Sequence, residues 1–86
     1  MSAVPMTSTT PRVTDFLVTA VSQLVGAEVS RDDNIFDIGV ESLMLVDLKE
    51  QILDEFGVSV KFSDFFTNFE IDSLASLIAE RAEDVR

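Results

Sequence analysis

A serine that follows a glycine-containing loop is the residue best placed to do chemistry. Ser42 stands three residues after Gly39, where an apolar pattern with helical spacing begins. The N–H groups and positive dipole end of a helix N-terminus suit a phosphate ester, and a glycine leaves the nearby hydroxyl accessible. Taken alone, a serine at a helix start is more often an N-cap. Both roles stay open for Ser42 on this evidence.

The residues that most enzymes use for catalysis at neutral pH are missing. The 86-residue chain has no Cys and no His, which excludes disulfides, thiolate nucleophiles, thiolate or zincin-type metal sites and serine–histidine triads. Its 16 acids provide carboxylate pairs, but nothing in the sequence gathers them into a pocket. An enzyme is therefore the weakest interpretation.

The charge balance excludes two classes of partner. Sixteen acids against six bases give a net charge of −10, which disfavours nucleic acid and anionic membranes because both reward basic surfaces. No apolar run approaches the roughly 20 residues that span a bilayer, and the N-terminus lacks a targeting segment. We expect one small domain, cytoplasmic and monomeric, with no membrane insertion and no bound nucleic acid.

Four acids lie in the loop at residues 26–40, after the first expected helix, and raise the question of calcium. An EF-hand loop needs glycine at its sixth position and glutamate at its twelfth. Counted from Asp32, those positions hold Asp37 and Leu43. Capping and solvation of the loop are favoured over metal binding for these acids: Glu28, Asp32, Asp33 and Asp37.

Apolar periodicity predicts the first helix. Residues 1–10 are small and polar and are expected to form a flexible leader, after which Thr10 and Pro11 suit an N-cap and the first helical position. One helical face follows, ended by Gly26; it comprises Val13, Phe16, Leu17, Ala20, Val21 and Leu24. The long loop at residues 26–40 is expected to pack its large apolar residues onto the core: Ile35, Phe36 and Ile38.

A second helix is predicted from Ser42 to Phe56, with Gly57 as its left-handed end. Its core stripe comprises Leu45, Leu48, Ile52 and Phe56. A second stripe is acidic with an apolar start and comprises Leu43, Asp47, Glu50 and Asp54, with Met44 and Val46 near its edges. Such a face suits a docking surface, although a solvated face explains the acids equally well.

The remaining segment predicts a short and a longer helix. Residues 58–60 are expected to be extended, and Ser63 is expected to cap a short turn over residues 64–66. The last helix places Asp72 in its first turn and Arg81 in its last, and its apolar face comprises Ile71, Leu74, Leu77, Ile78 and Ala82. The seven phenylalanines are expected to pack rather than line a ligand site. The fold class is therefore all-α, a small four-helix bundle of three main helices and one short helix, with a long loop between the first two.

Residues 36–48 resemble the phosphopantetheine attachment site of acyl carrier proteins, and especially of polyketide-synthase carriers. That family usually has Asp-Ser-Leu with a glycine two residues before the acid. Here Glu41, Ser42 and Leu43 follow Gly39 in that spacing. Further similarity lies in the loop at residues 33–36 and in the closing segment at residues 65–75, so that residues 11–86 are expected to form an acyl carrier domain.

The resemblance implies that Ser42 accepts 4′-phosphopantetheine from coenzyme A, supported by Gly39, Glu41 and Leu43, through a separate Mg²⁺-dependent phosphopantetheinyl transferase. The chain would be a phosphoprotein and the substrate of that transferase, not an enzyme. Its arm would carry acyl groups as thioesters, because the cofactor brings the missing sulfur. The implied partners are an acyltransferase or ligase, a ketosynthase and other acyl-processing enzymes of polyketide or fatty-acid-type biosynthesis.

The resemblance also implies a partner-facing side of the second helix, formed by Glu41, Leu43, Met44, Asp47 and Glu50. The chain departs from the family pattern at Glu41, where Asp is usual, and at Phe69 and Glu70, where Pro-Thr is usual. The second departure removes a rigid turn and an N-cap, so the last helix is expected to be less firmly held at its start. Val40 and Glu41 differ from the motif of peptidyl carriers, which argues against a nonribosomal-peptide module.

Two alternatives accompany the carrier hypothesis. The chain could be an unmodified helical adaptor that binds other proteins, in which case coenzyme A and a transferase would leave its mass unchanged. Because the sequence starts at Met1 and ends soon after the last expected helix, a free-standing carrier is expected, with a domain of a larger synthase as the other possibility.

Overall fold

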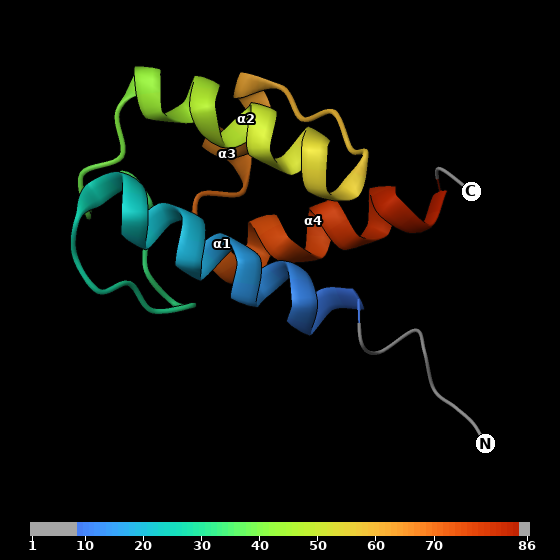
Figure 1. The fold of residues 1–86 in the computed structure, drawn as a ribbon, viewed down its shortest axis with the longest axis horizontal. Helices are drawn as coiled ribbons and strands as arrows, with labels where there is room; N and C mark the ends of the chain where they lie inside the picture. Colours follow the sequence, from blue (N-terminus) through green and yellow to red (C-terminus); the bar gives the residue numbers. More distant parts are fainter. Residues whose placement is uncertain (1–8, 85–86) are drawn as a thin grey trace.

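The computed structural model describes residues 9–84, which form four helices and, over that range, no strand (Figure 1). The helices are α1 (Thr9–Val25), α2 (Ser42–Phe56), α3 (Phe62–Thr67) and α4 (Ile71–Asp84). The all-α prediction is therefore confirmed, including the short third helix and the long connection between α1 and α2.

Helix α1 begins earlier than predicted. It starts at Thr9, so Thr10 lies inside the first turn rather than at the N-cap, and the Thr10 carbonyl accepts a hydrogen bond from Thr14 Oγ1 at 3.0 Å. Pro11 is tolerated there because the first N–H groups of any helix lack an intrahelical acceptor. Most of the predicted leader, residues 1–8, lies outside the described residues.

The end of α1 is as predicted. Gly26 adopts the left-handed conformation, with φ of 73°, and its N–H donates to the Ser22 carbonyl at 2.8 Å. This bond satisfies a carbonyl that has no partner further along the helix. The chain then leaves α1 in a new direction and enters the long loop.

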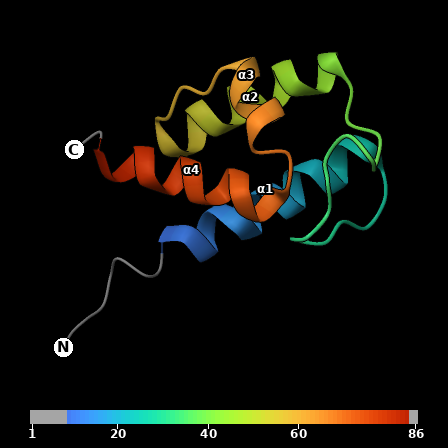
Figure 2. The same ribbon diagram turned by 180° about the vertical axis from the view of Figure 1, so that it is seen from behind.

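The core lies where the apolar faces of the helices meet. Helices α1 and α4 lie side by side, and α2 lies above them in Figure 1. Figure 2 shows the same arrangement from behind. The largest fully buried side chains come from every described helix and from the loops, which confirms the predicted faces: Val13, Leu17, Val21, Ile35, Leu45, Leu48, Ile52, Val58, Phe65, Ile71, Leu74 and Ile78.

The long loop between α1 and α2 is fixed to the start of α4. Ile35 is fully buried, and its N–H donates to the Phe69 carbonyl at 2.8 Å. The N–H of Ile71 donates to the Asp33 carbonyl at 3.2 Å, and that of Asp72 donates to the Arg31 carbonyl at 3.0 Å. The prediction that the last helix is less firmly held at its start is therefore wrong. Carbonyl groups of the loop accept hydrogen bonds from the first N–H groups of α4, which would otherwise need a cap.

Helix α3 is longer than predicted and is capped differently. It spans Phe62–Thr67, so Ser63 lies within it and does not cap it. Asp64 is the third residue of α3, and its carboxylate accepts a hydrogen bond from the N–H of the N-cap residue Lys61 at 2.8 Å. An acid at this helical position commonly caps the helix in this way. Asp64 also pairs with Arg81 of α4 at 2.7 Å and thereby joins the two helices.

The phenylalanines do not all pack into the core. Phe65 is fully buried, and three others are half-buried: Phe16, Phe36 and Phe56. The remaining three are exposed, which corrects the prediction that all seven pack: Phe62, Phe66 and Phe69. A six-residue helix has only one buried position here, so its other apolar residues face outward.

Candidate functional site

Ser42 is the first residue of α2 and is exposed to solvent. Glu41, with φ of −113° and ψ of 172°, occupies the N-cap position, and its carbonyl accepts the first helical bond from the Leu45 N–H at 3.0 Å. Over the described residues, the Ser42 hydroxyl makes no hydrogen bond. The alternative that Ser42 is merely an N-cap is therefore wrong, and its hydroxyl is free to react.

The N-terminus of α2 is open to an anion. The N–H groups of Ser42, Leu43 and Met44 precede the first helical bond, and the Glu41 side chain makes no capping hydrogen bond to them. No acidic residue lies in the first turn of α2. These N–H groups and the positive end of the helix dipole suit a phosphate ester on the Ser42 hydroxyl.

The loop before Ser42 is shaped by its backbone. Gly39 has φ of 105°, a conformation that residues with a side chain rarely adopt, although a Cβ there would meet no atom within 4 Å. The N–H of Val40 donates to the Ile35 carbonyl at 3.0 Å, and the Val40 side chain is buried. Gly39 is therefore required by the backbone conformation of the turn. The turn places the Val40 side chain in the core and leaves Ser42 exposed to solvent.

Asn34 holds this turn and was not singled out from the sequence. Its Oδ1 accepts from the N–H groups of Phe36 at 2.8 Å and Asp37 at 3.3 Å. Asn commonly folds its side chain onto the backbone two residues on, so an asparagine in the middle of this loop was an available signal of a turn. The loop geometry that presents Ser42 therefore begins eight residues before it.

The residues expected to face a partner fall into two groups. Leu43, Asp47 and Glu50 are exposed on α2, with Leu43 84% exposed, and Glu41 is exposed at the N-cap of the helix. Met44 is half-buried and packs against the core. The structure therefore brings the first four together with Ser42 on the outer side of the helix and turns Met44 partly inward.

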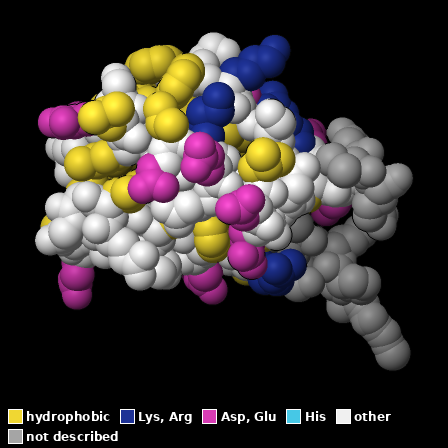
Figure 3. Space-filling model, turned by 45° about the horizontal axis from the view of Figure 1, so that its top comes forward, with side chains coloured by type: hydrophobic (Ala, Val, Ile, Leu, Met, Phe, Trp, Pro, Cys, Tyr) yellow, Lys and Arg dark blue, Asp and Glu magenta, His cyan; other side chains and the backbone are white. Residues whose placement is uncertain are grey.

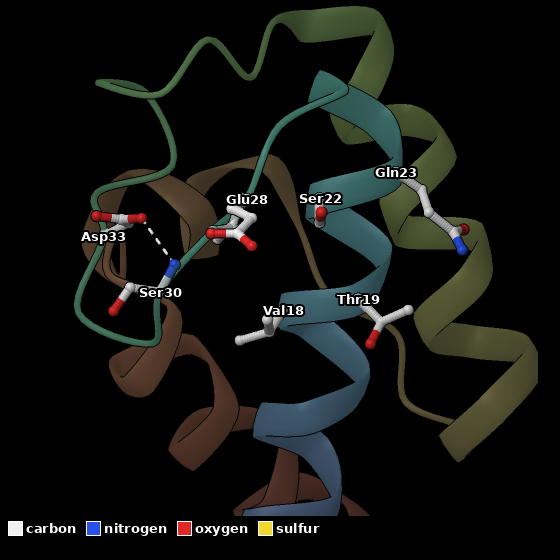
Figure 4. Close-up of a pocket in the computed structure, with 8 residues that line it drawn as sticks. Val18, Thr19, Ser22, Gln23, Glu28, Ser30 and Asp33 are labelled. Atoms are coloured by element: carbon white, nitrogen blue, oxygen red, sulfur yellow. Dashed lines mark hydrogen bonds between the residues drawn. The ribbon is translucent and has the colours of Figure 1, made fainter.

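Two surface hollows lie away from Ser42. The larger, of about 580 Å³, lies between α1 and the following loop, where Asp33 Oδ2 accepts the Ser30 N–H at 2.8 Å (Figure 4). Its lining residues are Val18, Thr19, Ser22, Gln23, Glu28, Val29, Ser30 and Asp33. The second lies between the N-terminal end of α1 and α4. Neither hollow includes a residue of α2.

Within residues 9–84, no group of three or more acids lies close enough to hold a metal ion. In the same part of the chain, no helix is both long and apolar enough to cross a membrane. The site thus consists of an exposed serine, an uncapped helix N-terminus and a constrained loop.

Comparison with known proteins identifies the family. Residues 15–79 match the phosphopantetheine attachment site family. A segment of 46 residues is also 44% identical to part of the hybrid PKS-NRPS synthetase TAS1 of Botryobasidium botryosum; it covers 54% of this chain and 3% of that protein. Since the family match spans most of the chain and carries the site described above, this chain belongs to the phosphopantetheine attachment site family, a phosphopantetheine-binding acyl carrier protein whose family carries covalently attached 4′-phosphopantetheine.

Proposed function

We propose that this chain carries acyl groups in polyketide-type biosynthesis through 4′-phosphopantetheine attached to Ser42. The observation that carries the proposal is an exposed, unbonded Ser42 hydroxyl at the uncapped N-terminus of α2. The similarity to part of a hybrid PKS-NRPS synthetase favours the polyketide setting over fatty-acid synthesis. That similarity covers only 3% of the synthase, so the pathway assignment belongs to the proposal alone.

The residues of this chain would bind and present the group rather than catalyse its transfer. The bond formed would join Ser42 Oγ to the phosphorus of coenzyme A that bears the pantetheine. The pyrophosphate P–O bond on the nucleotide side of that phosphorus would break, adenosine 3′,5′-bisphosphate would leave, and the transferase would take up the serine proton. No histidine exists in the chain to act as the base. When bound, the group supplies a thiol that holds acyl groups as thioesters.

Partner enzymes would approach the outer side of α2 around Ser42. Glu41, Asp47 and Glu50 offer carboxylates there, and Leu43 offers an exposed apolar contact. A contact formed largely by charges associates rapidly, weakens with salt and releases readily. These properties suit a carrier that must visit a transferase, an acyltransferase or ligase, and a ketosynthase in succession.

Intact-protein mass spectrometry tests the proposal. The chain is incubated with coenzyme A, Mg²⁺ and a broad-specificity phosphopantetheinyl transferase, and the wild type is expected to gain the mass of one phosphopantetheine. Ser42→Ala is expected to gain none, whereas Ser59→Ala, a matched change at another exposed serine, is expected to react fully. Asp47→Lys is expected to slow the reaction without preventing it.

Two results would contradict the proposal. An unchanged mass for the wild type would favour the adaptor hypothesis, in which the chain only binds other proteins. A full mass gain for a folded Ser42→Ala variant would place the attachment site elsewhere. Circular dichroism of each variant provides the control for folding.

A further inference from the structure

Asn34 lies where two sets of contacts meet in the loop before Ser42. Its backbone pairs with Glu70 in an isolated antiparallel bridge beside the start of α4. Its side chain contacts residues further along the chain, because Oδ1 accepts the N–H groups of Phe36 at 2.8 Å and Asp37 at 3.3 Å. Asn34 therefore connects the part of the loop that is fixed to α4 with the part that leads to Ser42.

The hydrogen bonds that start at Asn34 continue almost to Ser42. The Asn34 carbonyl accepts the N–H of Asp37 at 3.0 Å. The Ile35 carbonyl accepts the N–H of Val40 at 3.0 Å, and the Val40 side chain is buried. Val40 is two residues before Ser42, so the end of the loop is fixed just before the helix begins.

The first turn of α2 depends on this loop because it has no side-chain cap. The side chain of the N-cap residue Glu41 makes no capping hydrogen bond, and the first helical bond joins the Leu45 N–H to the Glu41 carbonyl at 3.0 Å. A helix start without a side-chain cap is less stable than a capped one. The orientation of the Ser42 hydroxyl therefore depends on how firmly the loop holds the residues just before it.

The oxygen of the Asn34 carboxamide is the atom that the loop uses. Only the oxygen of a carboxamide accepts hydrogen bonds, and in the described part of the chain the Nδ2 group donates to no partner. Asp keeps an oxygen at the same reach, Ala removes the oxygen, and Gln moves it one methylene outward. Substitution by these three side chains therefore separates the role of this atom from that of the Asn34 backbone.

We propose that Asn34 is a positioning residue for the attachment of 4′-phosphopantetheine, which acts by fixing the loop so that the Ser42 hydroxyl is held for reaction. This inference rests on the proposed function. In that reaction Ser42 Oγ would bond to the pantetheine-bearing phosphorus of coenzyme A, adenosine 3′,5′-bisphosphate would leave, and the transferase would take the serine proton. Misplacement of a reacting group by about 1 Å can slow a reaction about 100-fold. Loss of the Asn34 oxygen is therefore expected to lower kcat.

The side chains expected to bind the transferase do not change when Asn34 is substituted. Leu43, Asp47 and Glu50 lie on α2, whereas Asn34 lies in the loop before it. Figure 3, which brings the top of Figure 1 forward, shows acidic and apolar side chains interspersed on that face. The KM for the carrier is therefore expected to change little while kcat falls.

Steady-state kinetics of phosphopantetheine transfer, followed by intact-protein mass spectrometry, provide the test. The reaction contains coenzyme A, Mg²⁺ and a broad-specificity transferase. Asn34→Ala and Asn34→Gln are each expected to lower kcat about fivefold or more and to leave the KM for the carrier within about twofold. Asn34→Asp, which keeps the accepting oxygen, is expected to keep kcat within about twofold of the wild type.

Asn68→Ala is the matched control for a loss of stability alone. Asn68 is also half-buried, its Oδ1 accepts the Ser73 hydroxyl at 2.9 Å, and its Nδ2 donates to the Asp64 carbonyl at 3.1 Å. These bonds join α3 to α4 and do not involve residues 36–42. Asn68→Ala is therefore expected to lower the melting midpoint and to leave kcat within about twofold. Circular dichroism shows whether each variant is folded, and if Asn34→Ala is not, Asn34→Gln and Asn34→Asp give the comparison.

Amide hydrogen exchange of the unmodified chain measures the same effect without the transferase. The Leu45 N–H makes the first helical bond of α2, and the Ile52 N–H lies further along the same helix. The ratio of the Leu45 exchange rate to the Ile52 rate is expected to rise about fivefold or more in Asn34→Ala. In Asn68→Ala this ratio is expected to stay within about twofold, because a global loss of stability affects both amides.

Four results would overturn the proposal while leaving the proposed function intact. They are an unchanged kcat in Asn34→Ala and Asn34→Gln, an equal fall of kcat in Asn34→Ala and Asn68→Ala, a fall in Asn34→Asp as large as that in Asn34→Ala, and an unchanged exchange ratio in Asn34→Ala. A wild-type chain that gains no mass would overturn the proposed function itself, and the role of Asn34 in the reaction with it.

Discussion

At Ser42 the surroundings that favour a phosphate come from the backbone. Three N–H groups of α2 precede the first helical bond, and the Glu41 side chain leaves them uncapped. A phosphate ester can therefore be held without Lys or Arg, since helix N-termini bind anions through N–H groups and the dipole. The motif predicts Ser42 as the attachment site, and this stays a prediction. The exposure of Ser42 and the N-cap position of Glu41 could be learned only from the structure.

Asp64 is a residue whose importance the sequence does not reveal. Its partner Arg81 lies 17 residues away on another helix, beyond the reach of any local pattern. The Arg81 guanidinium, which donates to the carboxylate at 2.7 Å, lowers the pKa of Asp64, and the hydrogen bond from the Lys61 N–H lowers it further. The pair therefore makes the stability of the fold depend on pH.

We predict that Asp64→Asn flattens the loss of stability in acid. Because the folded-state pKa of Asp64 lies below its ordinary value of 3.8, the ionised carboxylate stabilises the fold above that value. This contribution is lost as the pH falls through the lowered folded-state pKa. Asn still accepts the Lys61 N–H, so the variant is expected to lose only about 1 kcal/mol near neutral pH, where Arg81 is partly screened by solvent.

Urea unfolding at neutral and acidic pH measures this effect. Between about pH 6 and about pH 2, the free energy of unfolding should fall less in Asp64→Asn than in the wild type. Arg81→Gln should flatten the same acidic range, and the double variant should flatten it no further. Equal acid sensitivity of the wild type and all three variants would show that the pair does not contribute.

At the scale of elements, periodicity predicts the helices and fails at the contacts between them. The core face of α1 and the limits of α2 follow from the spacing of their apolar residues and from the glycines that end them, Gly26 and Gly57. The bonds from the loop at residues 31–35 to the start of α4 join segments more than 30 residues apart. They replace the cap that Phe69 and Glu70 do not provide, and no local pattern predicts them.

Two adjacent residues of α2 test which face is buried. Ile52 is fully buried and Leu53 is 50% exposed. Ile52→Ala is expected to lower the free energy of unfolding by roughly 2–5 kcal/mol, because it leaves a cavity in the core. Leu53→Ala is expected to cost less than about 1 kcal/mol because its side chain already contacts water.

Chemical denaturation of both variants gives these two values. The assignment of the faces would be contradicted if Leu53→Ala proved the more damaging change.

At the scale of the whole molecule, charge opposes the compact state. Sixteen acids face six bases, and over residues 10–83 only two ion pairs are formed, between Arg31 and Asp72 and between Arg81 and Asp64. Composition predicts the self-repulsion, but not which acids find a basic partner. The spacing of apolar residues likewise does not tell which phenylalanines of the short helix α3 are buried in the core.

Added NaCl is therefore expected to stabilise the fold. Salt screens repulsion between exposed charges, and a gain of 1 kcal/mol would raise the melting midpoint of so small a domain by about 4–8 °C. The midpoint is followed by circular dichroism from low to physiological ionic strength. A midpoint that does not change with NaCl would mean that capping and local pairing already offset the acids.

The most direct test of the carrier assignment is the mass of one tryptic peptide. Cleavage after Arg31 and Lys49 releases residues 32–49, in which Ser42 is the only residue with a hydroxyl side chain. After reaction with coenzyme A and a phosphopantetheinyl transferase, tandem mass spectrometry of this peptide is predicted to show one phosphopantetheine, lost on fragmentation, with no other peptide changed. An unmodified peptide 32–49, or the added mass on any other peptide, would contradict the attachment at Ser42 on which the account depends.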